Sequence, residues 1–138
     1  MPTEAQWEKA ARGTEGRKYP FGDQFDPAKV WCSKSSLAGS RGTQSVGRYG
    51  ISLYSGCTDM AGNVWQWTAD LYDDKFWTSR PAESADPANI AAGETGSHVA
   101  RGGAWYFFGP QLFRSASRNA GNAVSWGDGN GFRCSAVP

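Results

Sequence analysis

A helical spacing of apolar positions is clearest near the start of the chain. Residues 4–12 are good helix formers, and Gly13 follows them. Thr3 and Gln6 have the spacing of a capping box, in which each side chain accepts a hydrogen bond from the other residue's backbone N–H. An apolar stripe begins at Trp7 and continues three and four positions later. The pattern predicts one helix at 4–12, anchored on the domain through Trp7.

Alternating apolar and polar positions predict short strands further along the chain. Residues 63–68 alternate and carry aromatic and β-branched side chains, which is typical of a half-buried strand. Two more short strands are predicted at 98–106 and 131–137, bracketing an irregular segment. Between the helix and the first strand, residues 13–53 combine Gly, Pro, Ser and Asp with single aromatics, which predicts an ordered loop held by rings. Residues 70–96 are polar and predict a long surface loop with at most a helical turn.

The composition supports one loop-rich α+β domain. The 138 residues fit a single domain, predicted over 1–138. Gly 18 and Pro 7 favour turns over long helices, while Trp 7, Tyr 5 and Phe 7 concentrate the core in large rings.

The charge and hydropathy of the chain argue against two classes of partner, nucleic acids and the membrane interior. A net charge of +1 without like-charged runs argues against nucleic-acid binding. No apolar stretch reaches the roughly 20 residues that span a bilayer, so no membrane span is expected. The first residues lack the pattern of a signal peptide, and the sequence does not identify the cellular compartment of the protein.

Candidate catalytic and metal-binding residues are few. His98 is the single histidine, and such a residue is more often a surface or capping group than a catalytic base. Cys32, Cys57 and Cys134 allow one disulfide at most, and without paired ligand spacing a zinc site made with His98 is disfavoured. Residues 127–131 lack the carboxylates of an EF-hand and predict a glycine-rich turn.

Residues 105–113 hold an unusual density of aromatic and apolar side chains around a Gly-Pro turn. Such a segment cannot turn every ring into one core, so some rings should be exposed and mark a recognition surface. The alternative is that all of them are core.

Four motifs in order carry a family resemblance: Pro2–Arg12, Asp59–Thr68, Arg101–Trp105 and Gly131–Arg133. Together they resemble the formylglycine-generating enzyme (sulfatase-modifying factor) family, which implies a loop-rich C-type-lectin-like fold with short antiparallel strands. Family members usually have a further N-terminal part before the first motif, and that part is expected to be absent here.

The resemblance also implies two metal sites. Family enzymes bind copper through a cysteine pair soon after the Gly-Gly of the third motif, but residues 104–118 contain no cysteine. Phe107 and residues 110–112 stand near the expected thiols and cannot bind Cu(I), so this oxidase activity is not expected. No cofactor is required, and calcium is expected only as an optional, weakened structural ion. Its ligands would lie at the matching positions Asp59, Gly62, Val64 and Gln66, the last replacing a usual Glu.

A non-catalytic branch of the fold fits better. The layout resembles the variable proteins of diversity-generating retroelements, in which exposed positions between the Gly-Gly-Ser/Ala-Trp motif and the terminal Gly-Phe-Arg are diversified. The resemblance implies a variable ligand-binding region at 104–133 that faces a protein or other macromolecular partner. The alternative is a sulfatase-modifying-factor-like enzyme or accessory domain without the cysteine pair. The implied ligand-binding residues are Tyr106, Phe107, Phe108, Leu112, Ser117, Val124, Ser125, Trp126, Asp128 and Asn130.

This interpretation separates recognition rings from framework rings. At least two of Tyr106, Phe107, Phe108 and Trp126 should be exposed on one face, with Leu112 beside them. The framework rings expected to be buried are Trp65, Trp67, Trp105 and Phe132.

Overall fold

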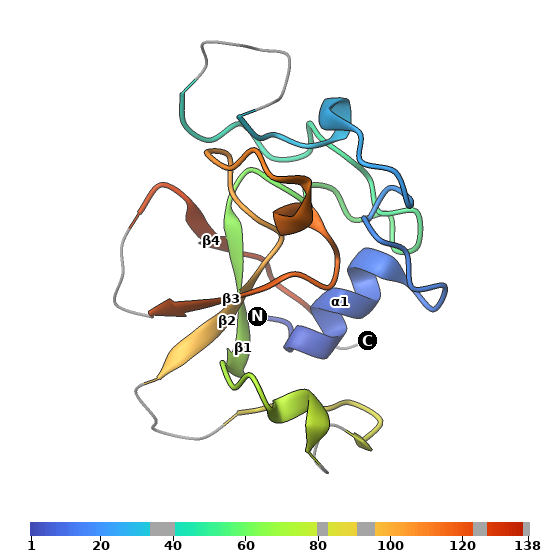
Figure 1. Ribbon diagram of the computed structural model, residues 1–138, viewed down its shortest axis with the longest axis vertical. Coiled ribbons are helices and arrows are strands. Elements are labelled where there is room, and N and C mark those ends of the chain that lie inside the picture. The colour runs from blue at the N-terminus through green and yellow to red at the C-terminus, as the bar shows by residue number, and fades with distance from the viewer. Residues whose placement is uncertain (34–40, 80–82, 91–95, 123–126, 137–138) are drawn as a thin grey trace.

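The computed structural model describes residues 1–33, 41–79, 83–90, 96–122 and 127–136. Figure 1 shows helix α1 beside the strands, with long loops above them. The elements are α1 (Glu4–Arg12), β1 (Trp65–Leu71), β2 (Ser97–Arg101), β3 (Arg118–Asn122), β4 (Asn130–Phe132) and the short 3-10 turns η1 (Pro27–Lys29), η2 (Phe76–Thr78) and η4 (Pro110–Phe113).

The helix forms as its sequence predicts. The Thr3 side chain accepts a hydrogen bond from the Gln6 backbone N–H, and the Gln6 side chain accepts one from Thr3, which completes the capping box. The chain leaves the helix at Gly13, whose φ of 65° suits glycine. Trp7 is 1% exposed and packs with Ala11 and Met60, so it is the anchor that was expected.

The strands form a four-stranded sheet with the order β3-β2-β1-β4. β2 pairs antiparallel with both β1 and β3, whereas β4 runs parallel to β1. The fold class is the expected α+β, C-type-lectin-like one, although one pairing is parallel. β3 was not predicted, because its five residues are polar or small and mostly exposed.

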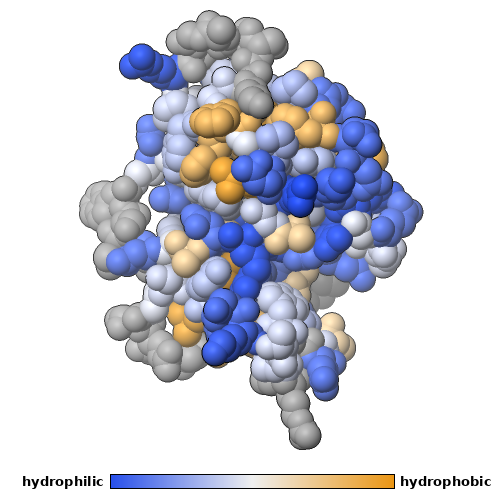
Figure 2. Space-filling model, in the orientation of Figure 1, coloured by the Kyte–Doolittle hydropathy of each residue, from blue (hydrophilic) through white to orange (hydrophobic). Residues whose placement is uncertain are grey.

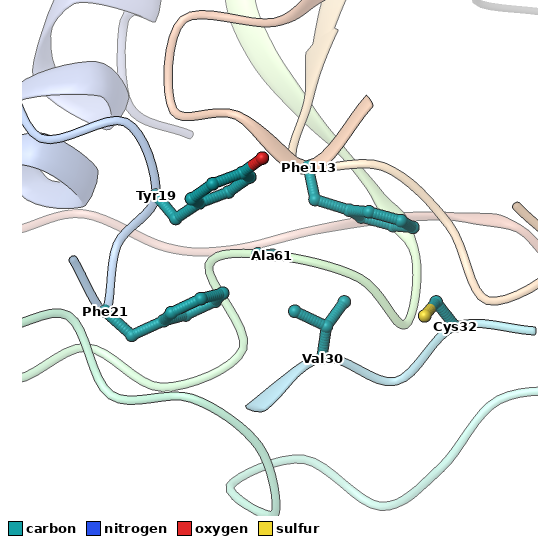
Figure 3. Close-up of a cluster of buried hydrophobic side chains, with 6 residues drawn as sticks. All are labelled: Tyr19, Phe21, Val30, Cys32, Ala61 and Phe113. Atoms are coloured by element: carbon teal, nitrogen blue, oxygen red, sulfur yellow. The ribbon is translucent and has the colours of Figure 1, made fainter. Parts of the chain in front are cut away.

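The loops before β1 are held by buried rings, as the sequence predicts. Tyr19 and Phe21 stack with their centroids 5.6 Å apart and their planes 5° apart. Figure 3 shows them beside Val30, with Phe113 approaching the same cluster from a distant part of the chain. This cluster fixes the loops on which the segment after β2 rests.

The described part of the chain contains no helix that is both long and apolar enough to cross a membrane.

Candidate functional site

The segment after β2 is placed by two glycines and one ring. Gly102 and Gly103 have φ of 92° and 80°, values that L side chains rarely adopt. A Cβ on Gly103 would lie 2.7 Å from Cδ1 of Phe113, so the backbone passes directly over that ring. Phe113 is fully buried and stacks on Phe25 at 5.9 Å. The segment is therefore anchored at both ends of residues 103–113.

Within this segment the rings divide into inward and outward groups. Phe107 is half-buried and packs edge-on against Trp65, with centroids 5.9 Å apart. Its carbonyl oxygen accepts hydrogen bonds from the backbone N–H and the hydroxyl of Ser33. Tyr106 is 44% exposed and Phe108 is 66% exposed. The exposure predicted for at least two of these rings is confirmed, while their sharing one face with Leu112 stays a prediction.

Tyr106 joins this segment to the C-terminal loop. A Cβ on Gly129 would lie 2.4 Å from Cε1 of Tyr106, so the tyrosine ring lies on the backbone of residue 129. The Gly129 carbonyl also accepts a 2.7 Å hydrogen bond from the backbone N–H of Trp65. Asp128 is exposed and Asn130 is half-buried beside this contact. We call the group of candidate binding residues Tyr106, Phe108, Asp128 and Asn130 the recognition face, a name that stands for the prediction and not for an observed contact among all four.

Hydrophobic side chains also gather on the surface of the loop-rich half of the molecule. In the view of Figure 2 they lie over the loops that occupy the upper half of Figure 1. An apolar concentration of this kind on a protein surface is typical of an interaction site.

The other predicted binding residues do not belong to the group just defined. Leu112 is half-buried in η4. Ser117 is half-buried, and its carbonyl accepts a 2.6 Å hydrogen bond from Nη1 of Arg101. That arginine lies over the ring of Trp7, on the side of α1. Three further predicted residues lie outside the described residues: Val124, Ser125 and Trp126.

The prediction for the framework rings is confirmed only in part. Trp65 is buried, whereas Trp67 and Trp105 are half-buried. The prediction that Phe132 is buried is wrong, because this ring is 69% exposed. β4 is a three-residue strand at the sheet edge, so Phe132 has no further strand beside it. No signal in the sequence separates this ring from a buried one.

An ion network that the sequence did not reveal joins α1 to the sheet. Arg118 donates two hydrogen bonds to the carboxylate of Glu4, at 2.6 and 2.9 Å. Arg101 is fully buried and pairs with Glu8 through Nη2. Its Nε lies 3.6 Å from Oε1 of Glu4, beyond hydrogen-bond length. Burial lowers the pKa of Arg101, whereas the two glutamates raise it. Two guanidinium groups of the sheet strands thus face two carboxylates of α1.

The residues that would hold copper do not fit that metal. Phe107, Pro110, Gln111 and Leu112 stand near the expected thiols, and none of them can supply a thiolate. The three cysteines form no disulfide with one another. Among the described residues, no three His, Cys, Asp or Glu side chains lie close enough to hold a metal ion.

The predicted calcium ligands have hydrogen-bond partners within the chain. The carboxylate of Asp59 accepts hydrogen bonds from the backbone N–H groups of Gly47 and Tyr49. Oε1 of Gln66 accepts one from Arg133 Nε at 2.7 Å. The carbonyl of Gly62 accepts the backbone N–H of Val64 at 2.9 Å. An oxygen of three of the four predicted ligand residues, Asp59, Gly62 and Gln66, therefore already accepts a hydrogen bond from within the chain.

The chain is similar in sequence to known formylglycine-generating enzymes and to an inactive relative of them. The chain is 33% identical over 152 residues to the formylglycine-generating enzyme of Thermomonospora curvata, covering all of this chain and 49% of that protein. It is 31% identical over 144 residues to the inactive C-alpha-formylglycine-generating enzyme 2 of Mus musculus, covering 99% of this chain and 42% of that one. The chain thus spans about half the length of these relatives.

A solved structure and a family model agree with this relationship. Variable protein 1 of Treponema denticola superimposes with a TM-score of 0.73 and 24% identity, over 96% of this chain and 45% of that one. At this identity the match shows a shared fold. The family model of the sulfatase-modifying factor enzyme 1-like domain matches residues 1–137. The chain therefore belongs to the sulfatase-modifying factor enzyme 1-like domain family.

Proposed function

We propose that this domain is a non-catalytic binding module whose recognition face takes a protein or other macromolecular partner. The observation that carries the proposal is the outward position of Tyr106 and Phe108 on a segment anchored by Phe107 and Phe113. A rigid backbone that presents exposed rings loses little conformational entropy on binding, and aromatic residues dominate the energetics of protein interfaces. With a net charge of +1, the chain has no basic surplus to hold nucleic acid.

The finer proposal is that the domain is a variable protein of a diversity-generating retroelement. Its support is the motif layout from Arg101 to Arg133, with exposed rings and polar side chains between the two ends. Tyr, Ser, Asn and Trp between these motifs are residue types that adaptable binding surfaces use.

The genome of the source organism tests this finer proposal. We expect an adenine-rich near-copy of the coding segment for residues 106–130 close to the gene, beside a reverse-transcriptase gene. A genome without this near-copy would contradict the retroelement assignment while leaving the binding module untouched.

The enzyme alternative predicts turnover, and we expect none. Incubated with copper, oxygen and a cysteine-containing sulfatase peptide, the protein should yield no aldehyde by mass spectrometry, because residues 104–118 supply no thiolate for copper. A bacterial formylglycine-generating enzyme is the positive control. Aldehyde formed above the buffer control would favour the enzyme alternative and contradict the proposed role.

The binding proposal predicts that affinity for the partner falls only when residues of the recognition face are substituted. The double variant Tyr106→Ser/Phe108→Ser should bind a captured partner at least about 30-fold more weakly, equivalent to about 2 kcal/mol, because two exposed anchors are removed. Its melting temperature should fall by only a few degrees, since Phe108 is exposed and the contact of Tyr106 with Gly129 is the packing that is lost. The partner would be captured from the source organism's environment on immobilised wild-type protein, and its affinity measured by calorimetry.

A matched control uses two other exposed apolar side chains. Leu53 is 62% exposed and Ile90 is 59% exposed. The variant Leu53→Ser/Ile90→Ser should bind as the wild type does. If both double variants lose binding equally, the partner is held by general surface hydrophobicity and the recognition face is wrongly assigned.

A further inference from the structure

The guanidinium of Arg133 contacts two of the residues that the family resemblance assigns to calcium, Gln66 and Asp59. Its Nε donates a 2.7 Å hydrogen bond to Oε1 of Gln66. Its Nη2 lies 3.0 Å from the Thr58 carbonyl and 3.4 Å from the Asp59 carbonyl. One side chain that follows β4 thus reaches two carbonyl oxygens of the segment before β1 and one side-chain oxygen of β1 itself.

Gln66 suits a guanidinium partner better than a metal. The residue is 4% exposed, and its Oε1 also accepts a 2.8 Å hydrogen bond from Nε1 of Trp7. Its Nε2 donates a 2.7 Å hydrogen bond to the Asp59 carbonyl. A carboxylate at this position would lack that donor hydrogen. The amide is therefore the side chain that this set of partners requires.

The negatively charged residue at this position is Asp59, and its carboxylate is hydrogen-bonded to backbone groups instead of to Arg133. The carboxylate of Asp59 is buried and accepts hydrogen bonds from the N–H groups of the chain at Gly47 and Tyr49. Its charge still acts on the guanidinium through space. Burial lowers the pKa of Arg133, while the nearby Cys57 and Asp59 raise it. An ordinary arginine pKa lies so high that the side chain stays charged near neutral pH.

We infer that Arg133 is the resident cation of this position, and that it ties the C-terminal segment to residues 58–66 in place of calcium. Calcium is held by six to eight oxygens, and here the Gln66 side-chain oxygen and the carbonyls of Thr58 and Asp59 are already hydrogen-bonded to an internal cation. This inference goes beyond the proposed binding function and does not depend on it. It also implies that the chain's thermal stability is independent of divalent ions.

The first experiment measures the melting temperature of the wild-type chain in millimolar calcium and in excess chelator. Ligand binding to the folded state raises the melting temperature in proportion to the logarithm of ligand concentration. We expect the same melting temperature in both conditions. A rise in the melting temperature that grows with calcium concentration overturns the inference.

The second experiment removes the internal cation. Arg133→Ala should lower the melting temperature by about 10 °C, because two acceptors on buried residues, Gln66 and Asp59, and one on half-buried Thr58 lose a charged donor. Arg114→Ala is the matched control, since Arg114 is exposed, and it should melt as the wild type does. Guanidinium ion at about 10–50 mM, too dilute to denature, should raise the melting temperature of Arg133→Ala alone. An Arg133→Ala variant as stable as the wild type, or one that guanidinium does not rescue, overturns the inference.

A third variant keeps the inference testable if Arg133→Ala does not fold. Gln66→Glu restores the usual family residue and leaves Arg133 in place. We expect it to melt at the same temperature with calcium as with chelator, because the new carboxylate pairs with the guanidinium. A calcium-dependent rise in its melting temperature would show that the metal displaces Arg133, and would overturn the inference.

Discussion

Replacing Arg101 with methionine is expected to lower the free energy of unfolding by about 3–5 kcal/mol. The guanidinium is fully buried, pairs with Glu8 and faces Glu4, which is 1% exposed. Removing it leaves Glu4 with Arg118 and Glu8 with Arg12, so two carboxylates keep one cation fewer at a buried site, and losing one charge of a buried group costs more than the ion pair itself contributes. The Ser117 carbonyl also loses its donor. Urea unfolding followed by tryptophan fluorescence measures the change.

The control for this variant is Arg48→Met, because Arg48 is exposed and donates a single hydrogen bond to the neutral Gln44 side chain. We expect a change within about 0.5 kcal/mol for it. Equal losses for the two variants would mean that the buried network contributes no more than a surface arginine, and would contradict the role given to Arg101.

Removing a framework ring should have an effect of similar size. Trp65→Ala is expected to lower the free energy of unfolding by about 3–5 kcal/mol, because the ring is 3% exposed and its removal leaves a cavity. It packs with Ala100 and Ala104, and supports Phe107 beneath the recognition face. Denaturant unfolding gives the change directly.

Phe108→Ala is the matched comparison, since it also removes an aromatic ring but from a position 66% exposed. Its stability should stay within about 0.5 kcal/mol of the wild type. If Phe108→Ala unfolds the domain, or Trp65→Ala leaves it unchanged, the division between framework and recognition rings is wrong.

Local features of the fold were predictable because they depend on neighbours in the sequence. The capping box, the glycine after the helix and the alternation around residue 65 act over a few residues, and the structure reproduces them. The exposed rings at Tyr106 and Phe108 also follow from a local fact, since a turn-rich segment cannot bury every side chain.

Features that depend on distant pairing were not predictable. β3 consists of polar and small residues, and it becomes a strand because residues 97–101 of β2 supply its hydrogen bonds. Phe132 has the pattern of a buried strand residue, yet its strand ends at the sheet edge. In both cases the position of another strand decides the outcome.

The sequence by itself determined the helix, the family motifs and the lack of thiols between residues 104 and 118, because these depend on residue identity and short spacing. Only the tertiary structure decided which charges meet. Glu4 and Arg118 are separated by 114 positions, and Gln66 and Arg133 by 67, yet each pair shares hydrogen bonds. A polar side chain's role is set by the partner that burial brings to it, and that partner is chosen by the packing of the whole domain.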